Sequence, residues 1–142
     1  MLGGVEITYE KGLSGHSDGD VVLHAVIDAM LGAAGLGDIG EQFPDSAPAY
    51  KDIDSCELLG QAGEKIEQAG FEVSNIDVTV IAQEPKLSAY KGQMSQRIAE
   101  VLGIEQEVVS IKAKTNEGAD AVGRGEAMAC HAVVLLDRIN RI

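Results

Sequence analysis

The sequence predicts one α+β domain over residues 1–142, with a sheet of about four strands and helices packed on one face. The length suits a single domain, because a chain of this size can bury enough surface for one core. Segments with the two-residue alternation of half-buried strands are separated by segments with helical periodicity. Their order is strand, helix, loop, helix, strand, helix, strand, strand, with no internal repeat or linker. This succession favours a layer of strands covered by helices.

The composition indicates what kind of core the protein has, which partners it is unsuited to bind and in which compartment it is expected. Hydrophobic residues make up 45% of the chain but aromatic residues only 4%, so the core must be aliphatic. The net charge of −12 argues against a nucleic-acid surface, which needs clustered lysine and arginine. No apolar run is long enough to span a membrane, and the N-terminal residues lack a signal-peptide pattern. We therefore expect a soluble cytoplasmic protein, or a stromal one in a plastid-bearing organism.

The chain is expected to begin with a turn that enters a strand over residues 2–7 and to continue with a helix from Val21 to about Leu31. Asp20 follows turn-forming residues and is a good N-cap for this helix. The helix has apolar residues at the spacing of a core-facing side. These residues are Val22, Leu23, Val26, Ile27, Met30 and Leu31.

A loop and a second helix are expected next. Residues 35–48 are too rich in glycine and proline for regular structure, and a loop of this length in a compact domain is usually functional or mobile. Asp54 to Glu57 has the form of a capping box, with an apolar helical face after it and Gly70 at the end. We interpret this second helix as scaffold.

The second half of the chain alternates strands and a helix. A clear half-buried strand ends near Pro85, where smooth continuation is impossible. Polar residues follow the next predicted strand, a common place for functional sites. The expected elements are a strand over 71–82, a helix around 94–102, a strand over 108–113, a turn over 118–125 and a strand over 127–136 that is interrupted by His131.

Residues that can bind metals recur every four positions at His16, Asp20, His24 and Asp28, although His16 would lie in the loop before the first predicted helix. On a helix, this spacing keeps side chains near one face, so metal ligands could converge there. His24 could equally be a hydrogen-bonded core histidine. Cys56 and Cys130 match no metal-ligand spacing and fit buried, reduced thiols.

Several stretches taken together resemble one family. They are YEKGL, GHSDGDVVLHAVIDAMLGAAGLGDIGEQFPD, IDVTVIAQEPKL, KAKTNE and GRGEAMACHAVVLL. In this order and over nearly the whole chain, they are similar to 2-C-methyl-D-erythritol 2,4-cyclodiphosphate synthase of the non-mevalonate isoprenoid pathway. The resemblance implies a trimer-forming cyclodiphosphate synthase fold, with active sites at the subunit interfaces of a homotrimer. It also implies the conversion of 4-diphosphocytidyl-2-C-methyl-D-erythritol 2-phosphate to the cyclodiphosphate with release of CMP.

The same resemblance implies roles for individual residues and two kinds of metal ion. His24 would be a zinc ligand, and Glu117 would hold magnesium or manganese. The expected catalytic residues are His16, Lys114, Thr115 and Glu117. The expected substrate-binding residues are Ser17, Asp38, Gly40, Phe43, Asp45, Ala82, Pro85, Lys86, Leu87, Ala113 and Arg124. Arg124 would face a central channel, where some relatives bind a prenyl diphosphate.

The sequence departs from the family at its start. In the family, an Asp-x-His pair in a strand near the N-terminus completes the zinc site, and the residues shown begin after that stretch. We expect the pair upstream of Met1 in the natural protein, since His24 alone would hold zinc weakly and His131 is not placed to replace it. The alternative is a non-catalytic trimer that binds cytidine nucleotide or prenyl diphosphate. A generic metal hydrolase built on His16, Asp20 and His24 is a third hypothesis.

Overall fold

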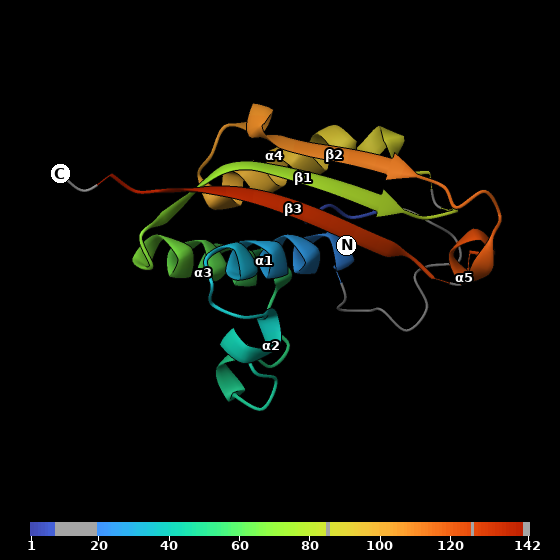
Figure 1. Ribbon diagram of the computed structural model, residues 1–142. Coiled ribbons are helices and arrows are strands. Elements are labelled where there is room, and N and C mark those ends of the chain that lie inside the picture. Colours follow the sequence, from blue (N-terminus) through green and yellow to red (C-terminus); the bar gives the residue numbers. More distant parts are fainter. Residues whose placement is uncertain (8–19, 85, 126, 141–142) are drawn as a thin grey trace.

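The computed structural model of the chain describes residues 1–7, 20–84, 86–125 and 127–140 (Figure 1). The helices are α1 (Val21–Ala33), α2 (Ile39–Gln42), α3 (Ser55–Gln68), α4 (Lys91–Leu102) and α5 (Asp120–Gly123). The strands are β1 (Phe71–Ile81), β2 (Val109–Lys114) and β3 (Ala129–Arg138). Short 3-10 turns lie at Pro48–Tyr50, Ser88–Tyr90 and Gln106–Val108. No helix in these described ranges is long and apolar enough to cross a membrane.

The sheet has the strand order β2-β1-β3, so that β1 is central. It runs parallel to β2 and antiparallel to β3, and Val78 lies opposite Ile111 on one side and Ala132 on the other. Helix α1 packs against β3 and β1, α4 packs against β2, and α3 fills the space beside α1 and α4. In Figure 1, α1 and α3 lie below β3 and α4 lies behind β1 and β2. Residues of all three helices share one core with Ile76, Val78 and Val80 of β1, so the helices cover the same face of the sheet. The predicted α+β class, with helices on one face, is confirmed.

The predicted strand count needs correction, because the described part of the chain has three strands in its sheet and not about four. Residues 2–7 form a tight turn in which Leu2 and Val5 make an isolated antiparallel bridge. Gly3 and Gly4 both have positive φ angles, of 58° and 75°, which glycine adopts without a steric penalty. Their N–H groups point to the Asp20 carboxylate and not to a neighbouring strand.

Two segments predicted as irregular contain short helices. Within residues 35–48, Asp38 caps α2 by accepting a hydrogen bond from Glu41 N at 2.8 Å. Within residues 118–125, Asp120 starts α5 and accepts from Val122 N at 2.9 Å. In both places an aspartate side chain satisfies an N–H group at the helix start, so a single turn forms despite the neighbouring glycines.

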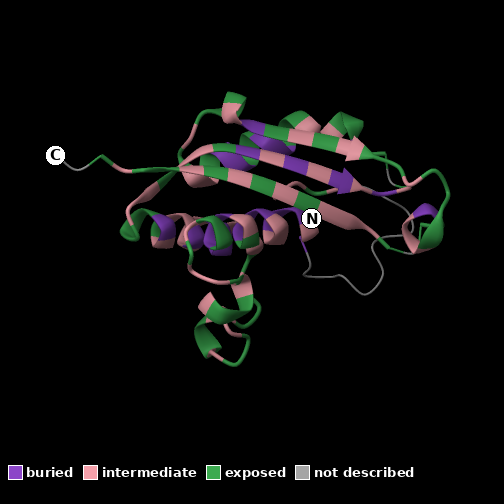
Figure 2. Cartoon of the chain, in the orientation of Figure 1, coloured by how far each residue is buried: buried purple, intermediate pink, exposed green. Residues whose placement is uncertain are grey.

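The core lies between the helices and one face of the sheet. Figure 2 shows the alternation along β1, where Ile76, Val78 and Val80 are buried. The opposite face carries an Asp77–Lys112 ion pair at 3.0 Å, but no helix packs on it within the described residues. On that face, Val133 is 69% exposed and Leu135 is 55% exposed. His131 lies on the same face of β3, two residues before Val133, and is also exposed.

Both cysteines are unpaired, as expected. Cys56 and Cys130 are half-buried free thiols. Burial, together with the negative charge of Asp20, raises the pKa of the Cys130 thiol to about 11. Burial also raises the pKa of Cys56, although the Arg97 guanidinium opposes this effect. Both groups are therefore protonated near neutral pH, which makes them poor nucleophiles.

Asp20 ties the N-terminal turn to the first helix. Its side chain is only 2% exposed. One carboxylate oxygen accepts hydrogen bonds from Gly3 N at 2.8 Å and Leu23 N at 3.0 Å, and the other accepts from Gly4 N at 2.8 Å. The prediction that Asp20 is an N-cap is confirmed, and the same carboxylate also holds a turn that is distant in sequence.

Replacing Asp20 by alanine should destabilise the fold by about 3 kcal/mol, because three N–H groups lose a charged acceptor. Asp20→Asn keeps one acceptor oxygen and should lose less. Urea unfolding followed by circular dichroism measures both changes. Glu100→Ala is a suitable control, since this residue is exposed and should change stability by less than about 0.5 kcal/mol. A loss for Asp20→Ala no larger than that of the control would contradict this role.

Candidate active site

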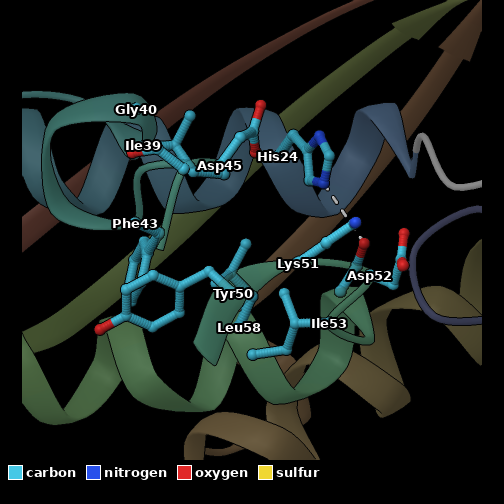
Figure 3. Close-up of a pocket in the computed structure, with 12 residues that line it drawn as sticks. His24, Ile39, Gly40, Phe43, Asp45, Tyr50, Lys51, Asp52, Ile53 and Leu58 are labelled. Atoms are coloured by element: carbon cyan, nitrogen blue, oxygen red, sulfur yellow. Dashed lines mark hydrogen bonds between the residues drawn. The ribbon is translucent and has the colours of Figure 1, made fainter. Parts of the chain in front are cut away.

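A cavity of about 750 Å³ lies between α1, the α2 segment and the start of α3. Figure 3 shows side chains from all three regions directed into it. The lining residues are His24, Ile39, Gly40, Phe43, Asp45, Ser46, Tyr50, Lys51, Asp52, Ile53, Ser55 and Leu58. Four of them, His24, Gly40, Phe43 and Asp45, are predicted site residues. The structure therefore brings together one part of the predicted site.

His24 forms the α1 side of this cavity. It lies one turn into the helix, where its backbone N–H donates to Asp20 O at 2.9 Å. Its ring is half-buried, and Nε2 lies 3.3 Å from the hydroxyl oxygen of Ser55, the first residue of α3. This contact orients the imidazole between two helices. His24 is therefore a hydrogen-bonded residue of the pocket wall and not a fully enclosed core histidine.

The α2 segment forms the opposite side. Asp38, a predicted site residue that is not among the lining residues, caps α2 by accepting a hydrogen bond from Glu41 N with its Oδ1. Gly40 lies inside α2 and has no side chain to fill the cavity, and exposed Asp45 follows in the next turn. These residues offer a carboxylate and a close approach to backbone, the kind of groups that bind hydroxyls.

Aromatic packing anchors this segment to α3. Phe43 is 4% exposed, and its ring meets that of Tyr50 edge-on with centroids 5.2 Å apart. The Lys65 ammonium of α3 lies 5.3 Å from the centroid of the Phe43 ring. Phe43 was predicted as a substrate contact in a mobile loop, but here it also fastens that loop to the scaffold.

Sequence reasoning missed the residues just before α3. Tyr50, Lys51, Asp52 and Ile53 all line the cavity. Lys51 is the only lysine or arginine among the described residues that do so, and Figure 3 shows its side chain directed toward His24. One signal was available: Lys51 is a lone cation between a glycine-rich loop and an aspartate cap, in a chain with a net charge of −12.

The described residues do not form a complete metal site. In residues 1–7, 20–84, 86–125 and 127–140, no three His, Cys, Asp or Glu side chains lie close enough to hold an ion together. Catalytic zinc usually has three protein ligands and one open position. Among the described residues of the pocket wall, His24 is the one that was predicted as a zinc ligand. The residues that recur every four positions have different functions. Asp20 and Asp28 accept hydrogen bonds from backbone N–H groups, whereas His24 faces the cavity.

A second group of predicted site residues lies at the carboxyl ends of β1 and β2. Ala82 N donates to Lys114 O at 2.9 Å, which aligns the two strand ends. Gly118 N donates to the Gln83 side chain at 3.3 Å, which draws the segment after β2 toward the one after β1. Glu117 is exposed and has a φ of 51° in this turn. The predicted residues here are Ala82, Lys86, Leu87, Ala113, Lys114, Thr115 and Glu117.

The two groups of predicted residues occupy different parts of one chain. Figure 1 shows α2 projecting beyond α1 and α3, whereas the ends of β1 and β2 lie near α5. Arg124 is the C-cap of α5 and is exposed. His16, Ser17 and Pro85 lie outside the described residues.

A second cavity, of about 510 Å³, lies between the C-terminal ends of α3 and α4 and the start of β1. It is lined by apolar residues such as Leu102 and Ile104 together with the acidic residues Glu64, Glu67 and Glu72. Among the described residues, its lining includes no predicted site residue and no lysine or arginine. The cavity at His24 is therefore the stronger candidate for an anionic ligand.

Sequence comparisons identify relatives along almost the whole chain. The model of the YgbB family matches residues 1–137. The chain is 55% identical over 136 residues to the 2-C-methyl-D-erythritol 2,4-cyclodiphosphate synthase of Desulfosudis oleivorans, a match that covers 96% of this chain and 81% of the relative. It is 57% identical over 136 residues to the synthase of the same name from Erwinia tasmaniensis, with coverages of 96% and 87%.

Solved structures agree with the sequence comparisons. The bifunctional IspDF of Campylobacter jejuni matches with a TM-score of 0.91 and 46% identity, over 99% of this chain and 38% of that protein. The IspF of Plasmodium falciparum, solved as a CDP complex, matches with a TM-score of 0.81 and 35% identity, over 98% of this chain and 83% of that one.

Proposed function

The chain belongs to the YgbB family of 2-C-methyl-D-erythritol 2,4-cyclodiphosphate synthases, and we propose that the cavity at His24 holds the methylerythritol end of its substrate. The activity of the chain is that of the family. It converts 4-diphosphocytidyl-2-C-methyl-D-erythritol 2-phosphate to 2-C-methyl-D-erythritol 2,4-cyclodiphosphate and CMP, a step in isoprenoid precursor biosynthesis. The observation that carries the site assignment is the convergence of His24, Gly40, Phe43 and Asp45 on one cavity.

The reaction closes a ring within one substrate molecule. An oxygen of the 2-phosphate forms a bond to the β-phosphorus, and the bond from that phosphorus to the bridging oxygen breaks. The bridging oxygen leaves on CMP with the electron pair of the broken bond. Because no water is consumed, we assign the enzyme to the phosphorus-oxygen lyases. The attacking phosphate is already ionised near neutral pH, so alignment and charge neutralisation matter more than a general base.

The substrate would contact both groups of predicted residues. Asp38, Gly40 and Asp45 would bind methylerythritol hydroxyls, while residues at the ends of β1 and β2 would hold the cytidine and phosphates. Ala82 and Leu87 are buried and offer apolar surface, whereas Lys114 and Thr115 are exposed. His16, Ser17 and Pro85 stay predicted contacts of the diphosphate and the cytosine.

The separation of these groups within one chain supports an active site shared between chains. We propose a homotrimer in which Lys114 and Thr115 of one subunit contact the phosphates of a substrate held at His24 of another. Val133 and Leu135 on the open face of the sheet are exposed, and burying them would favour assembly. Arg124 would then face a central channel, where a prenyl diphosphate could bind.

The family depends on metal ions, and we propose zinc at His24 and magnesium or manganese at Glu117. When bound, such cations neutralise phosphate charge. His24 is already oriented by Ser55, and Glu117 is exposed in a turn next to the proposed phosphate site. The other zinc ligands would come from outside the described residues. The cytoplasm is the proposed location.

Incubation of the natural gene product with its diphosphocytidyl substrate should release one CMP for each cyclodiphosphate formed. Phosphorus NMR measures both products in one sample. Free inorganic phosphate should not accumulate, because the attacking group is part of the substrate. Release of phosphate without cyclodiphosphate would instead identify a hydrolase. Absence of CMP release from a folded protein supplied with zinc and magnesium would refute the synthase function.

Lys51 should assist binding of the anionic substrate. Lys51→Met should raise KM about three- to tenfold, because it removes the cation of the cavity from a site that must accept phosphates. The effect is modest because the side chain is exposed. Lys51→Arg keeps the charge and should stay close to the wild type. Steady-state kinetics at two salt concentrations measure the change, and added salt should reduce the difference between the wild type and Lys51→Met.

Lys91→Met is the matched control for Lys51. Lys91 is the first residue of α4 and does not line the cavity, although its loss changes the net charge equally. An equal rise in KM for both variants would show a general charge effect and would remove Lys51 from the site.

A further inference from the structure

Asp28 connects two elements on different sides of the cavity. It lies on α1 one turn after His24, and its Oδ1 accepts a hydrogen bond from Ile39 N at 2.8 Å. Ile39 is the first residue of α2, so its N–H has no acceptor within that helix. The bond therefore holds the start of α2 against the helix that carries His24.

Other contacts around Asp28 fix the segment without duplicating this bond. Leu36 N donates to Leu31 O at 2.9 Å, and the Gln42 side chain donates to Leu36 O at 2.8 Å, which shapes the turn before α2. At the far end, the Phe43 ring packs against Tyr50. The Asp28 carboxylate makes the side-chain hydrogen bond that connects α1 to the first turn of α2.

This hydrogen bond lies next to two predicted substrate contacts. Asp38 and Gly40 are the immediate sequence neighbours of Ile39. Asp38 Oδ1 is used by Glu41 N, so the position of the remaining Oδ2 depends on where the first turn of α2 is held. Movement of that turn would change the distance across the cavity from His24 to Gly40, which lines it, and would also shift Asp38, which precedes α2 and is not a lining residue. A displacement of about 1 Å is enough to weaken binding or catalysis strongly.

We propose that Asp28 is a positioning residue that sets Asp38 and Gly40 at the correct distance from His24 for the hydroxyl-bearing end of the substrate. This inference rests on the proposed function, because it assigns those two residues to the substrate. Asp28 itself need not touch the substrate. Its carboxylate acts through the Ile39 N–H group.

The test compares Asp28→Ala, Asp28→Asn and the control Glu100→Ala. Asp28→Ala should raise KM about five- to tenfold and change kcat less than about twofold, because hydroxyl contacts bind the ground state and the transition state similarly. Asp28→Asn keeps an oxygen acceptor for Ile39 N and should restore most of the affinity. Glu100 is an exposed residue of α4 and its replacement should change neither constant.

Two further measurements separate positioning from general stability. Amide hydrogen exchange at Ile39 should become faster in Asp28→Ala and recover in Asp28→Asn, while the urea midpoint stays close to that of the control. Calorimetry of substrate binding in the presence of a chelator gives Kd without turnover, and this Kd should rise in Asp28→Ala as KM does.

These measurements show separately whether the role of Asp28 fails and whether the synthase function fails. If the wild type binds the substrate but releases no CMP, the synthase function fails, and the Kd values of the variants still decide the role of Asp28. An unchanged Kd and KM in Asp28→Ala, with faster exchange at Ile39, would overturn the inference. A fall in affinity that Asp28→Asn does not restore would also overturn it, because the charge and not the tie would then be responsible.

Discussion

The Asp20 carboxylate is the interaction on which the arrangement of this fold depends. It is almost fully buried, yet three backbone N–H groups satisfy it, two from the Gly3–Gly4 turn and one from α1. A buried carboxylate with fewer partners would be costly, so the turn, the helix start and the carboxylate stabilise one another. Helix α1 begins at this point and carries His24 one turn later. The position of the site therefore follows from the way the helix is capped.

Helix α1 uses successive turns for different purposes. Its apolar side packs against the sheet and the other helices, and its remaining side carries His24 and Asp28. Ser55 contacts the His24 ring from α3, while Asp28 holds α2 through Ile39. A rigid helix with ties to both neighbours can hold polar groups at fixed separations, which a reaction between two phosphate groups requires.

The sequence predicted local features well. The N-cap at Asp20, the bounds of α1 and the alternation along β1 all depend on residues close together in the chain. The family resemblance, not the periodicity, pointed to the His24 cavity. Neither approach found the carboxylate contacts of Asp20 with Gly3 or of Asp28 with Ile39, because these bonds join residues 17 and 11 positions apart. The short helix α2 was also missed, although its cap is local, because the surrounding glycines and prolines favoured irregular structure.

The central claim is that the cavity at His24 binds the methylerythritol end of the substrate. Backbone amide chemical shifts, recorded while substrate is added to labelled protein in chelator, test it most directly. The account predicts the largest changes at Gly40 and Lys51, with little change at Gly63 and Ile104, which line the cavity between α3 and α4. Changes concentrated at Gly63 and Ile104, with the His24 cavity unaffected, would contradict it.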